Sequence, residues 1–405
     1  MTDIRPLADA DMPALRSLDG WAFGTVVDDV RWRVATAPLE RQRQIGAFVD
    51  GGLVGHTAAF TQVLTTPGGS VPAAGITWVA VSPAHRRRGV MSTLLHHQLD
   101  ELHEGGEPVA TLWASEPGIY GRFGYGVATR RAAVAAPRGV ALGGAPDAGA
   151  TVVLGEAADQ IEACSEVYDK VRALRPGMVS RSVEAWRESS FDDPTAPGPR
   201  SSLRCAVAVG PQNQPTGYAW FRTRPNWDGG DPQGTVEVAE ILAESPDGYR
   251  ALLDMVLDLD LMSTVRFWNL PLDHPLLTWT GQTHRLRATL EEQLWVRLVR
   301  LDEALAARTY ATPIDIVLEV ADPACPWNDG RWRVCADHTG ATVQRSSDPA
   351  DLQVTASVLA SGYLGDDALH RALAGGALTE STRGAATALA RAMRGDVAPW
   401  CAYMF

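Results

Sequence analysis

In the first third of the chain, apolar residues recur with two different spacings, one typical of strands and one typical of a helix. The stretch "IGAFVDGGLVGHTAAFTQVL" predicts a strand, a tight turn at Asp50-Gly51-Gly52 and a second strand. Residues 76–81 predict a third strand and "PVATLWAS" a fourth. Between these two, apolar residues recur at helical spacing from Val90 to His103, interrupted at Gln98, and Gly105-Gly106 ends that helix. Residues 1–130 are therefore predicted to be mixed α/β.

The same order of elements recurs in residues 151–297. A strand at 236–242, the loop "ESPDGY", a helix at 250–261 and the strand "VRFWNLPL" follow one another. Its loop carries no arginine cluster, so either this is a second copy of the first core that lost an anion site, or it is the ordinary recurrence of a common strand–helix–strand order. Residues 131–150 are rich in Ala, Gly and Pro and are expected to connect two domains or to form an irregular excursion.

The last hundred residues predict a third unit. "DIVLEV", "RWRVCA", "ATVQR" and "DLQVTA" are short strands, "ASVLASGYLG" and "ESTRGAATALARAMRG" are helices, and "APWCAYMF" is an apolar, strand-like tail. Cys325 and Cys335 could oppose each other in a hairpin. The expected domains are residues 1–135, 150–297 and 300–405, and the expected fold class is α/β with α+β character.

Composition narrows the classes of function. A chain of 405 residues with 45% hydrophobic and 21% charged residues is expected to form two or three domains. Its net charge of −12 argues against nucleic acid and anionic membranes and favours cationic partners. There is no apolar run of the roughly 18–20 residues that a membrane span needs, and no secretory start. Five scattered cysteines favour a reduced, cytoplasmic setting.

Three consecutive arginines, Arg86, Arg87 and Arg88, stand between the predicted strand 76–81 and the predicted helix. A strand that passes through a short loop into a helix leaves free N–H groups and the positive helix end at one point, where phosphate binds. The usual phosphate-loop signatures are absent. A solvated basic turn is the alternative, but the strand before the loop and the amphipathic helix after it favour an anion site.

The pattern Arg86-x-x-Gly89-x-Met91 resembles the [QR]-x-x-G-x-[GA] of the GNAT N-acetyltransferases, although Met91 replaces a small residue. That resemblance implies acetyl-CoA as co-substrate, held by the diphosphate, with pantetheine between splayed strands at 76–81 and 108–115. Together with "WASEPGIYGRFGYGVATR", the three-part layout and the apolar end, it extends to the Eis family of acetyltransferases. In that family the middle domain is a degenerate acetyltransferase core, the last resembles sterol carrier proteins, and the assembly is a homohexamer.

The family resemblance also implies the site residues. It makes Tyr120 the general acid and the C-terminal carboxylate of Phe405 the general base. The implied acetyl-CoA contacts are Val79, Ala80, Val81, Arg86, Arg87, Arg88, Gly89, Val90, Met91, Ser92, Ser115 and Glu116. The candidates for binding the acceptor are Phe23, Asp28, Trp32, Trp78, Trp113 and Met404.

The chemistry of acyl transfer to an amine fits these roles. The incoming ammonium must lose a proton, and the departing thiolate is helped by gaining one. A phenol with a pKa of about 10 is nearly matched to a thiol, but Tyr125 is a competing phenol that residue chemistry alone does not exclude. A carboxylate is a weak base unless burial raises its pKa. It could instead only orient the amine while water carries the proton.

The acceptor segment departs from relatives that take aminoglycosides. Asp28 and Asp29 could pair with a substrate ammonium, but the family's aspartate aligns with Thr25, and Met404 stands where some relatives carry a carboxylate. Fewer acidic groups would weaken the attraction for a polycation. A different or narrower range of amines is therefore expected.

The sequence thus predicts a cytoplasmic, acetyl-CoA-dependent N-acetyltransferase that transfers directly to a small-molecule or peptide amine, such as an aminoglycoside, a polyamine or a lysine side chain. The alternatives are a non-catalytic CoA- or lipid-binding protein and an acyltransferase that uses a longer acyl-CoA. No metal is expected. His96, Asp100 and His103 share one side of the predicted helix, but this stripe is interpreted as solvated.

Overall fold

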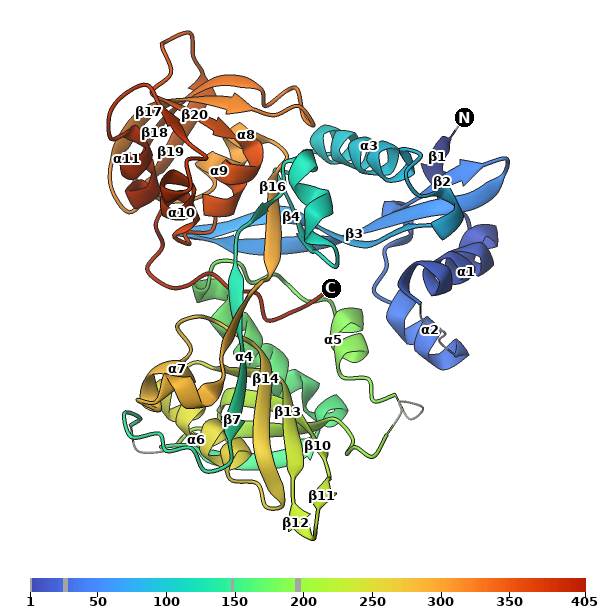
Figure 1. Ribbon diagram of the computed structural model, residues 1–405, viewed down its shortest axis with the longest axis vertical. Helices are drawn as coiled ribbons and strands as arrows, with labels where there is room; N and C mark the ends of the chain where they lie inside the picture. Colours follow the sequence, from blue (N-terminus) through green and yellow to red (C-terminus); the bar gives the residue numbers. More distant parts are fainter. Residues whose placement is uncertain (1, 25–27, 147–148, 194–197) are drawn as a thin grey trace. The chain divides into compact units, whose positions relative to one another are not determined.

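The computed structural model describes residues 2–24, 28–146, 149–193 and 198–405. The chain divides into two compact units, and Figure 1 shows their elements. Unit 1 comprises residues 1–129, 293–399 and 403–405, and unit 2 comprises residues 130–292 and 400–402. In the described part of the chain, no helix combines the length and apolarity that crossing a bilayer requires.

The first sheet of unit 1 has seven strands in the order β1-β2-β3-β4-β5-β16-β6. The predicted hairpin and the two following strands are confirmed, and β4 is longer than predicted. The strands are β1 (Asp3–Pro6), β2 (Gln44–Val49), β3 (Gly52–Thr66), β4 (Gly69–Val81), β5 (Val109–Trp113), β6 (Gly126–Val127) and β16 (Leu294–Leu298). Helices α1 (Met12–Phe23), α2 (Asp29–Thr36) and α3 (Val90–Glu104) accompany them.

Helix α3 is the predicted amphipathic helix and packs on β2, β3 and β4. Leu94, Leu95 and Leu99 lie in its fully buried stripe, and burying each leucine stabilises the fold by about 1.5–3 kcal/mol. The interruption at Gln98 has a structural reason, because its buried side chain accepts a hydrogen bond of 3.0 Å from Thr57 Oγ1 on β3. The polar position therefore fixes the helix to the sheet.

The C-terminal part of unit 1 is a five-stranded sheet, β19-β18-β17-β20-β21, with helices (Figure 1). Its predicted strands are confirmed, and the second predicted helix is shorter than expected. The elements are α8 (Leu301–Ala306), β17 (Ile314–Ala321), β18 (Gly330–Asp337), β19 (Gly340–Arg345), β20 (Leu352–Thr355), α9 (Ala356–Gly362), α10 (Ala368–Ala374), β21 (Thr379–Glu380) and α11 (Ala385–Ala392). Residues 398–405 form no strand, so the strand-like tail is wrong, although Trp400 and Tyr403 are buried as its apolar character implies.

Unit 2 contains a second seven-stranded sheet, in the order β15-β7-β14-β13-β10-β9-β8. Helix α6 begins at Pro246, so "ESPDGY" supplies its N-cap and first turn and is not a loop before it. The strands are β7 (Arg130–Pro137), β8 (Thr151–Glu156), β9 (Arg204–Val209), β10 (Pro215–Arg224), β13 (Gly234–Ala243), β14 (Met262–Leu270) and β15 (Thr289–Glu292), beside a small ribbon of β11 (Trp227–Asp228) and β12 (Asp231–Pro232). The helices are α4 (Ile161–Leu174), α5 (Val183–Ser189), α6 (Pro246–Leu257) and α7 (Pro275–Trp279).

Two strands pair in a sheet other than the one their sequence position suggests. Strand β7, inside the segment expected to connect domains, is paired with β14 and β15 in the second sheet. Strand β16 returns to the first sheet and pairs with β5 and β6. The expected connection at 131–150 is therefore wrong for residues 131–137. The sheets also do not divide at residues 135 and 297, because pairing partners distant in the chain decide which sheet a strand joins.

A buried ion pair joins β16 to the C-terminal part of unit 1. Arg297 and Asp322 are both fully buried, and the Arg297 Nη2 atom lies 2.8 and 2.7 Å from the two Asp322 carboxylate oxygens. Asp322 also accepts hydrogen bonds from the Cys325 amide and the Asn328 side chain. Cys325 and Cys335 are free thiols and do not pair.

We expect Asp322→Asn to destabilise unit 1 by about 3–5 kcal/mol, because it leaves the Arg297 charge buried without a counter-charge. The measurement is the free energy of the first unfolding transition in denaturant. Asp315→Asn is the matched control, because Asp315 pairs with Arg333 on an exposed strand surface and should change stability little. Equal effects of the two substitutions would contradict this assignment.

Candidate active site

Strands β4 and β5 part at the end of their shared ladder. They pair in parallel only from Ala73↔Val109 to Ile76↔Leu112, although β4 continues to Val81. Beyond this point β4 also bulges against β3. The register passes from Ala58↔Thr77 to His56↔Ala80, so that two residues of β4 oppose one of β3. The splayed pair of strands that the family resemblance implies is thus present.

The bulge places Trp78 in an unusual conformation. Its φ is +52°, in the left-handed region that residues other than glycine seldom adopt. The Nδ1 atom of His56, which is fully buried, lies 3.1 Å from the Trp78 carbonyl oxygen. Burial lowers the pKa of His56 to about 4, so the ring is neutral and Nδ1 carries the proton that it donates. Sequence analysis missed His56, because a single histidine in a strand carries no distinguishing pattern.

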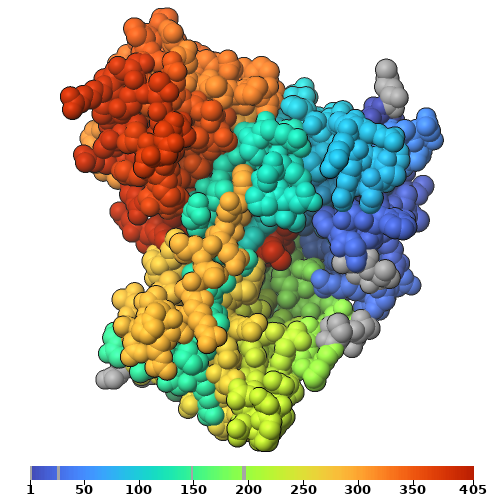
Figure 2. Space-filling view, in the orientation of Figure 1, coloured from blue at the N-terminus to red at the C-terminus, as the bar shows by residue number. Residues whose placement is uncertain are grey.

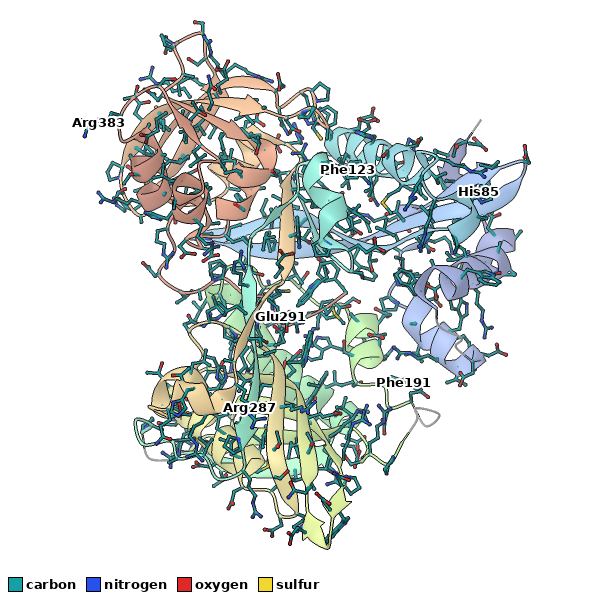
Figure 3. All side chains as sticks on the ribbon, viewed as in Figure 1. His85, Phe123, Phe191, Arg287, Glu291 and Arg383 are labelled. Carbon is teal, nitrogen blue, oxygen red and sulfur yellow. The ribbon has the colours of Figure 1, made fainter. Side chains whose placement is uncertain are left out.

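The arginine loop follows β4 after one 3₁₀ turn, Pro83–His85. Arg86, Arg87 and Arg88 are exposed and form no ion pair with any other residue in the described ranges. Figure 2 shows this light-blue segment at the molecular surface, and Figure 3 labels His85 at its start. Gly89 has a φ of +81°, which favours glycine, and open space surrounds it.

The N-terminus of α3 is open to an anion. No side chain caps it, and its first turn contains no acidic residue. The first amides of a helix lack intrahelical partners, and here three arginines precede them in the chain. Val90 is buried beneath the turn, while Met91 is partly buried against the same core. This turn therefore combines positively charged side chains, amide groups without partners in the helix, and exposure to solvent.

The corresponding turn of unit 2 lies between β13 and α6, and a side chain of the protein itself caps the helix there. The Ser245 hydroxyl caps α6 by accepting a hydrogen bond from the Gly248 amide, and Asp247 adds negative charge to the first turn. Strands β13 and β14 are also parallel, with their last pair at Val238↔Phe267. Beyond it, the Trp268 indole donates a hydrogen bond of 2.6 Å to the Ala239 carbonyl oxygen. The second core therefore keeps the architecture but lacks the uncapped, cationic turn.

The two candidate phenols differ in exposure. Tyr120 lies in the 3₁₀ helix η4 (Pro117–Phe123) and is 7% exposed, whereas Tyr125 is 1% exposed. Their rings make an edge-to-face contact at 6.0 Å. Burial, with a smaller contribution from Glu116, raises the pKa of Tyr120 to about 12, and burial raises the pKa of Tyr125 further. The hydroxyl of Tyr120 is therefore protonated throughout the neutral range.

The buried Arg297 supports the end of η4. Gly124 follows η4 with a φ of +80°, and a Cβ atom there would overlap the Arg297 guanidinium. Only glycine fits both the conformation and the space. Phe123, labelled in Figure 3, meets the His96 ring of α3 edge-to-face at 5.3 Å. The Tyr120 segment is thus held by β16 on one side and α3 on the other.

The chain end is anchored to the first sheet. The Trp113 indole, at the end of β5, donates a hydrogen bond of 3.1 Å to the Tyr403 carbonyl oxygen. The Phe405 ring meets Phe60 of β3 edge-to-face at 6.2 Å. Phe405 is half-buried, whereas the Met404 side chain is 57% exposed. The terminus is therefore an ordered part of unit 1 beside the strands that part.

The candidate acceptor residues on β4, α1 and α2 differ in what they contact. The Trp32 and Trp78 rings meet at 5.5 Å, edge to face, beside the bulge. Phe23 is exposed at the end of α1, and Asp28 caps α2 by accepting from the Arg31 amide at 2.8 Å. The Arg16 guanidinium lies 2.6 Å from Asp29 and lowers the pKa of that carboxyl. Thr25 lies outside the described residues.

The remaining candidates are the implied acetyl-CoA contacts on β4, at the start of α3 and after β5. Val79, Ala80 and Val81 lie on β4 beyond the shared ladder, Ser92 lies in the first turn of α3, and Ser115 and Glu116 are exposed between β5 and η4. The stripe interpreted as solvated is partly covered, because His103 stacks on Trp327 at 4.2 Å. In the described part of the chain, no cluster of three His, Cys, Asp or Glu could hold a metal ion.

Comparison with known proteins agrees with this architecture. Residues 3–128 and 177–301 each match a family model described as an acetyltransferase (GNAT) domain, and residues 301–402 match a sterol carrier protein domain. An uncharacterized N-acetyltransferase of Streptomyces avermitilis is 38% identical over 408 aligned positions, with all of both chains covered. N-acetyltransferase Eis of Mycobacterium tuberculosis is 33% identical, with 81% of this chain and 79% of the relative covered.

A solved structure gives the same assignment. The crystal structure of Eis1 from Mycobacterium abscessus is 31% identical, with a TM-score of 0.84 and all of both chains covered. The chain therefore belongs to the Eis-like N-acetyltransferases, with two GNAT domains followed by a sterol-carrier-like domain. The interpretation of the middle region as a second copy of the core is thereby confirmed.

Proposed function

We propose that this acetyltransferase transfers the acetyl group of acetyl-CoA directly to a primary amine. GNAT acetyltransferases in general use acetyl-CoA. The observation that carries the proposal here is the turn 86–92, where three unpaired arginines and an uncapped helix stand at the end of β4. Guanidinium groups and free amides match a diphosphate. Beyond Ile76↔Leu112, the unpaired strand edges could hold the pantetheine amides.

In the proposed reaction the amine nitrogen attacks the acetyl carbonyl carbon and the carbon–sulfur bond breaks. The acceptor ammonium gives up one proton before attack, and its nitrogen loses another as the amide forms. One proton ends on the departing sulfur and the other passes to solvent. Tyr120 donates to the sulfur, and the Phe405 carboxylate receives a proton from the amine or orients it for water. A phenol with a pKa of about 12 is a weaker acid than a thiol, so hydrogen-bond donation to the developing thiolate is the larger part of this role.

The proposed acceptor is a small-molecule or peptide amine. A chain with net charge −12 attracts cations over distance, and the Trp32 and Trp78 rings offer aromatic surface to an ammonium group. The Asp29 charge is already balanced by Arg16, so we propose a narrower amine range than a more acidic site would take. By family resemblance, we also propose a cytoplasmic homohexamer.

The test of the proposed function is thiol release. Purified protein is mixed with acetyl-CoA and a panel of aminoglycosides, polyamines and lysine peptides, and free thiol is followed. Release that requires an amine supports the proposal. Binding of acetyl-CoA without thiol release with any amine would favour a non-catalytic CoA-binding protein. Faster thiol release from a longer acyl-CoA would identify that acyl-CoA as the donor.

We expect Arg86→Ala, Arg87→Ala and Arg88→Ala together to raise the KM for acetyl-CoA by about 100-fold, because each charge-assisted hydrogen bond to phosphate is worth about 1.5–3 kcal/mol and exposure lowers it. kcat should change little, since the diphosphate is bound equally in ground and transition states. Arg383→Ala, at an exposed site on the C-terminal part, is the control. An unchanged KM in the triple variant would contradict the assignment.

We expect Tyr120→Phe to lower kcat by about 100-fold or more, the range for removing one hydrogen-bond donor to a developing negative charge. Because the folded pKa is raised, the acid form is retained as pH increases and is lost only near pH 12. The wild-type profile of kcat against pH should therefore show no decline caused by Tyr120 below about pH 11. Tyr125→Phe is the control. A full rate for Tyr120→Phe would remove Tyr120 from the mechanism.

We expect one glycine added after Phe405 to lower kcat by about tenfold or more, because it moves the terminal carboxylate by roughly 3.5 Å. The rings of Phe60 and Phe405 remain, so the fold should be kept. Thermal unfolding checks the fold and thiol release checks the rate. Val397→Ala, which changes an exposed apolar residue earlier in the tail and leaves the carboxylate in place, is the control. Wild-type turnover of the extended chain would exclude a role for the carboxylate.

A further inference from the structure

Unit 2 has an open pocket of about 560 Å³ on one face of its sheet. This volume lies in the ordinary range of small-molecule sites, about 300–1,000 Å³. The side chains that line it on β7, β13 and β14 alternate with the buried residues that form the core around α6. The lining residues used below are Ala133, Ala135, Arg200, Arg222, Glu237, Ala239, Arg266, Trp268, Arg287 and Thr289.

Strand register sets charged residues across this face. Ala135 of β7 is opposite Arg266 of β14, Arg266 is beside Glu237 of β13, and Glu237 is opposite Arg222 of β10. Thr289 of β15 is opposite Ala133, and Arg287 precedes Thr289 by two residues. Arg266 therefore lies beside Ala135, and Arg287, which precedes β15 and has a φ of +45°, lines the same pocket. Figure 3 labels Arg287 and Glu291, which mark the β15 side of this face.

The charges of the pocket do not balance. Glu237 is bound by Arg224 at 2.7 Å, and Arg222 and Arg200 lie beside Asp192. Arg266 and Arg287 are exposed and form no ion pair with any residue of the described chain. Arg266 is flanked by Glu237, but that carboxylate is already engaged. Two cations thus remain without partners in a chain whose net charge is −12.

The floor between the two arginines is apolar and fixed. Ala133, Ala135 and Ala239 carry small side chains, which let a ligand approach the sheet. The Trp268 ring forms a wall, held by its hydrogen bond to the Ala239 carbonyl and covered by the Arg131 guanidinium at 4.6 Å. Arg131 is itself held by Glu291 at 2.5 Å and by the Trp268 carbonyl at 2.6 Å. The pocket is therefore preformed, which lowers the entropy cost of binding.

We propose that this pocket binds an amphipathic anion, with a carboxylate or phosphate head between Arg266 and Arg287 and an apolar body over the three alanines and Trp268. Guanidinium groups recognise both kinds of head. A polyanion such as nucleic acid is disfavoured, because the acidic chain repels it away from the two arginines. The second core, which lost its diphosphate turn, keeps a ligand site on a different surface.

The test is calorimetric titration of the full chain with octanoate and with octyl phosphate, in the presence of saturating CoA so that the first core is occupied. We expect one site per chain, and the tighter of the two probes identifies the head group. Octanol and octylammonium should bind at least tenfold more weakly. Arg266→Gln with Arg287→Gln should weaken octanoate binding about tenfold or more, and Ala135→Trp should abolish it by filling the floor. Arg383→Gln is the control.

All variants should keep the wild-type thermal unfolding transition, which shows that the chain is folded and keeps this test separate from that of the proposed function. Octanoate binding that survives Ala135→Trp, or octylammonium binding as tight as octanoate, would overturn the proposal. So would the absence of binding by both anionic probes to the wild-type chain.

Discussion

Two parallel strands that begin a ladder together and then separate impose the main constraint on unit 1. β4 and β5 share four residue pairs, after which the backbone of β4 has a hydrogen-bonding partner on one side only. Unpaired backbone groups must find partners in ligand, side chain or water. The neighbouring elements are arranged around this gap. His56 holds the bulged carbonyl of Trp78, Gln98 of α3 holds Thr57 opposite it, and the chain end is fixed to Trp113.

The two acetyltransferase cores show how few residues distinguish a cationic, uncapped helix start from a capped one. Both have parallel central strands followed by a helix that packs on the sheet. In unit 1 the helix begins without a side-chain cap, after three arginines that pair with no residue in the part of the chain that the structure describes. In unit 2 a serine hydroxyl occupies the same position on the helix, an aspartate adds repulsion, and Trp268 bonds the carbonyl beyond the last strand pair. The fold is kept because its core is apolar packing, which these polar changes do not touch.

The sterol-carrier-like part is joined to the candidate site through buried contacts within unit 1. Arg297 of β16 reaches Asp322 on one side and packs beneath Gly124 on the other, at the end of the segment that carries Tyr120. A buried charge pair is weak evidence for stability by itself, but it fixes orientation because a displaced partner would leave an uncompensated charge. The position of Tyr120 thus depends on Arg297 and Asp322, which follow it in the chain by 177 and 202 positions.

The sequence by itself determined the strands and the amphipathic helix around residues 44–113 and the arginine turn, because period, glycine position and charge are local properties. It also indicated the second core through its repeated order. Only the tertiary structure decided which sheet β7 and β16 join, what Gln98 and His56 bind, that Asp28 is a helix cap, and that the apolar tail is anchored by a tryptophan and a ring contact without forming a strand. Each of these depends on a partner far away in the chain, and neither periodicity nor local propensity carries information about such partners.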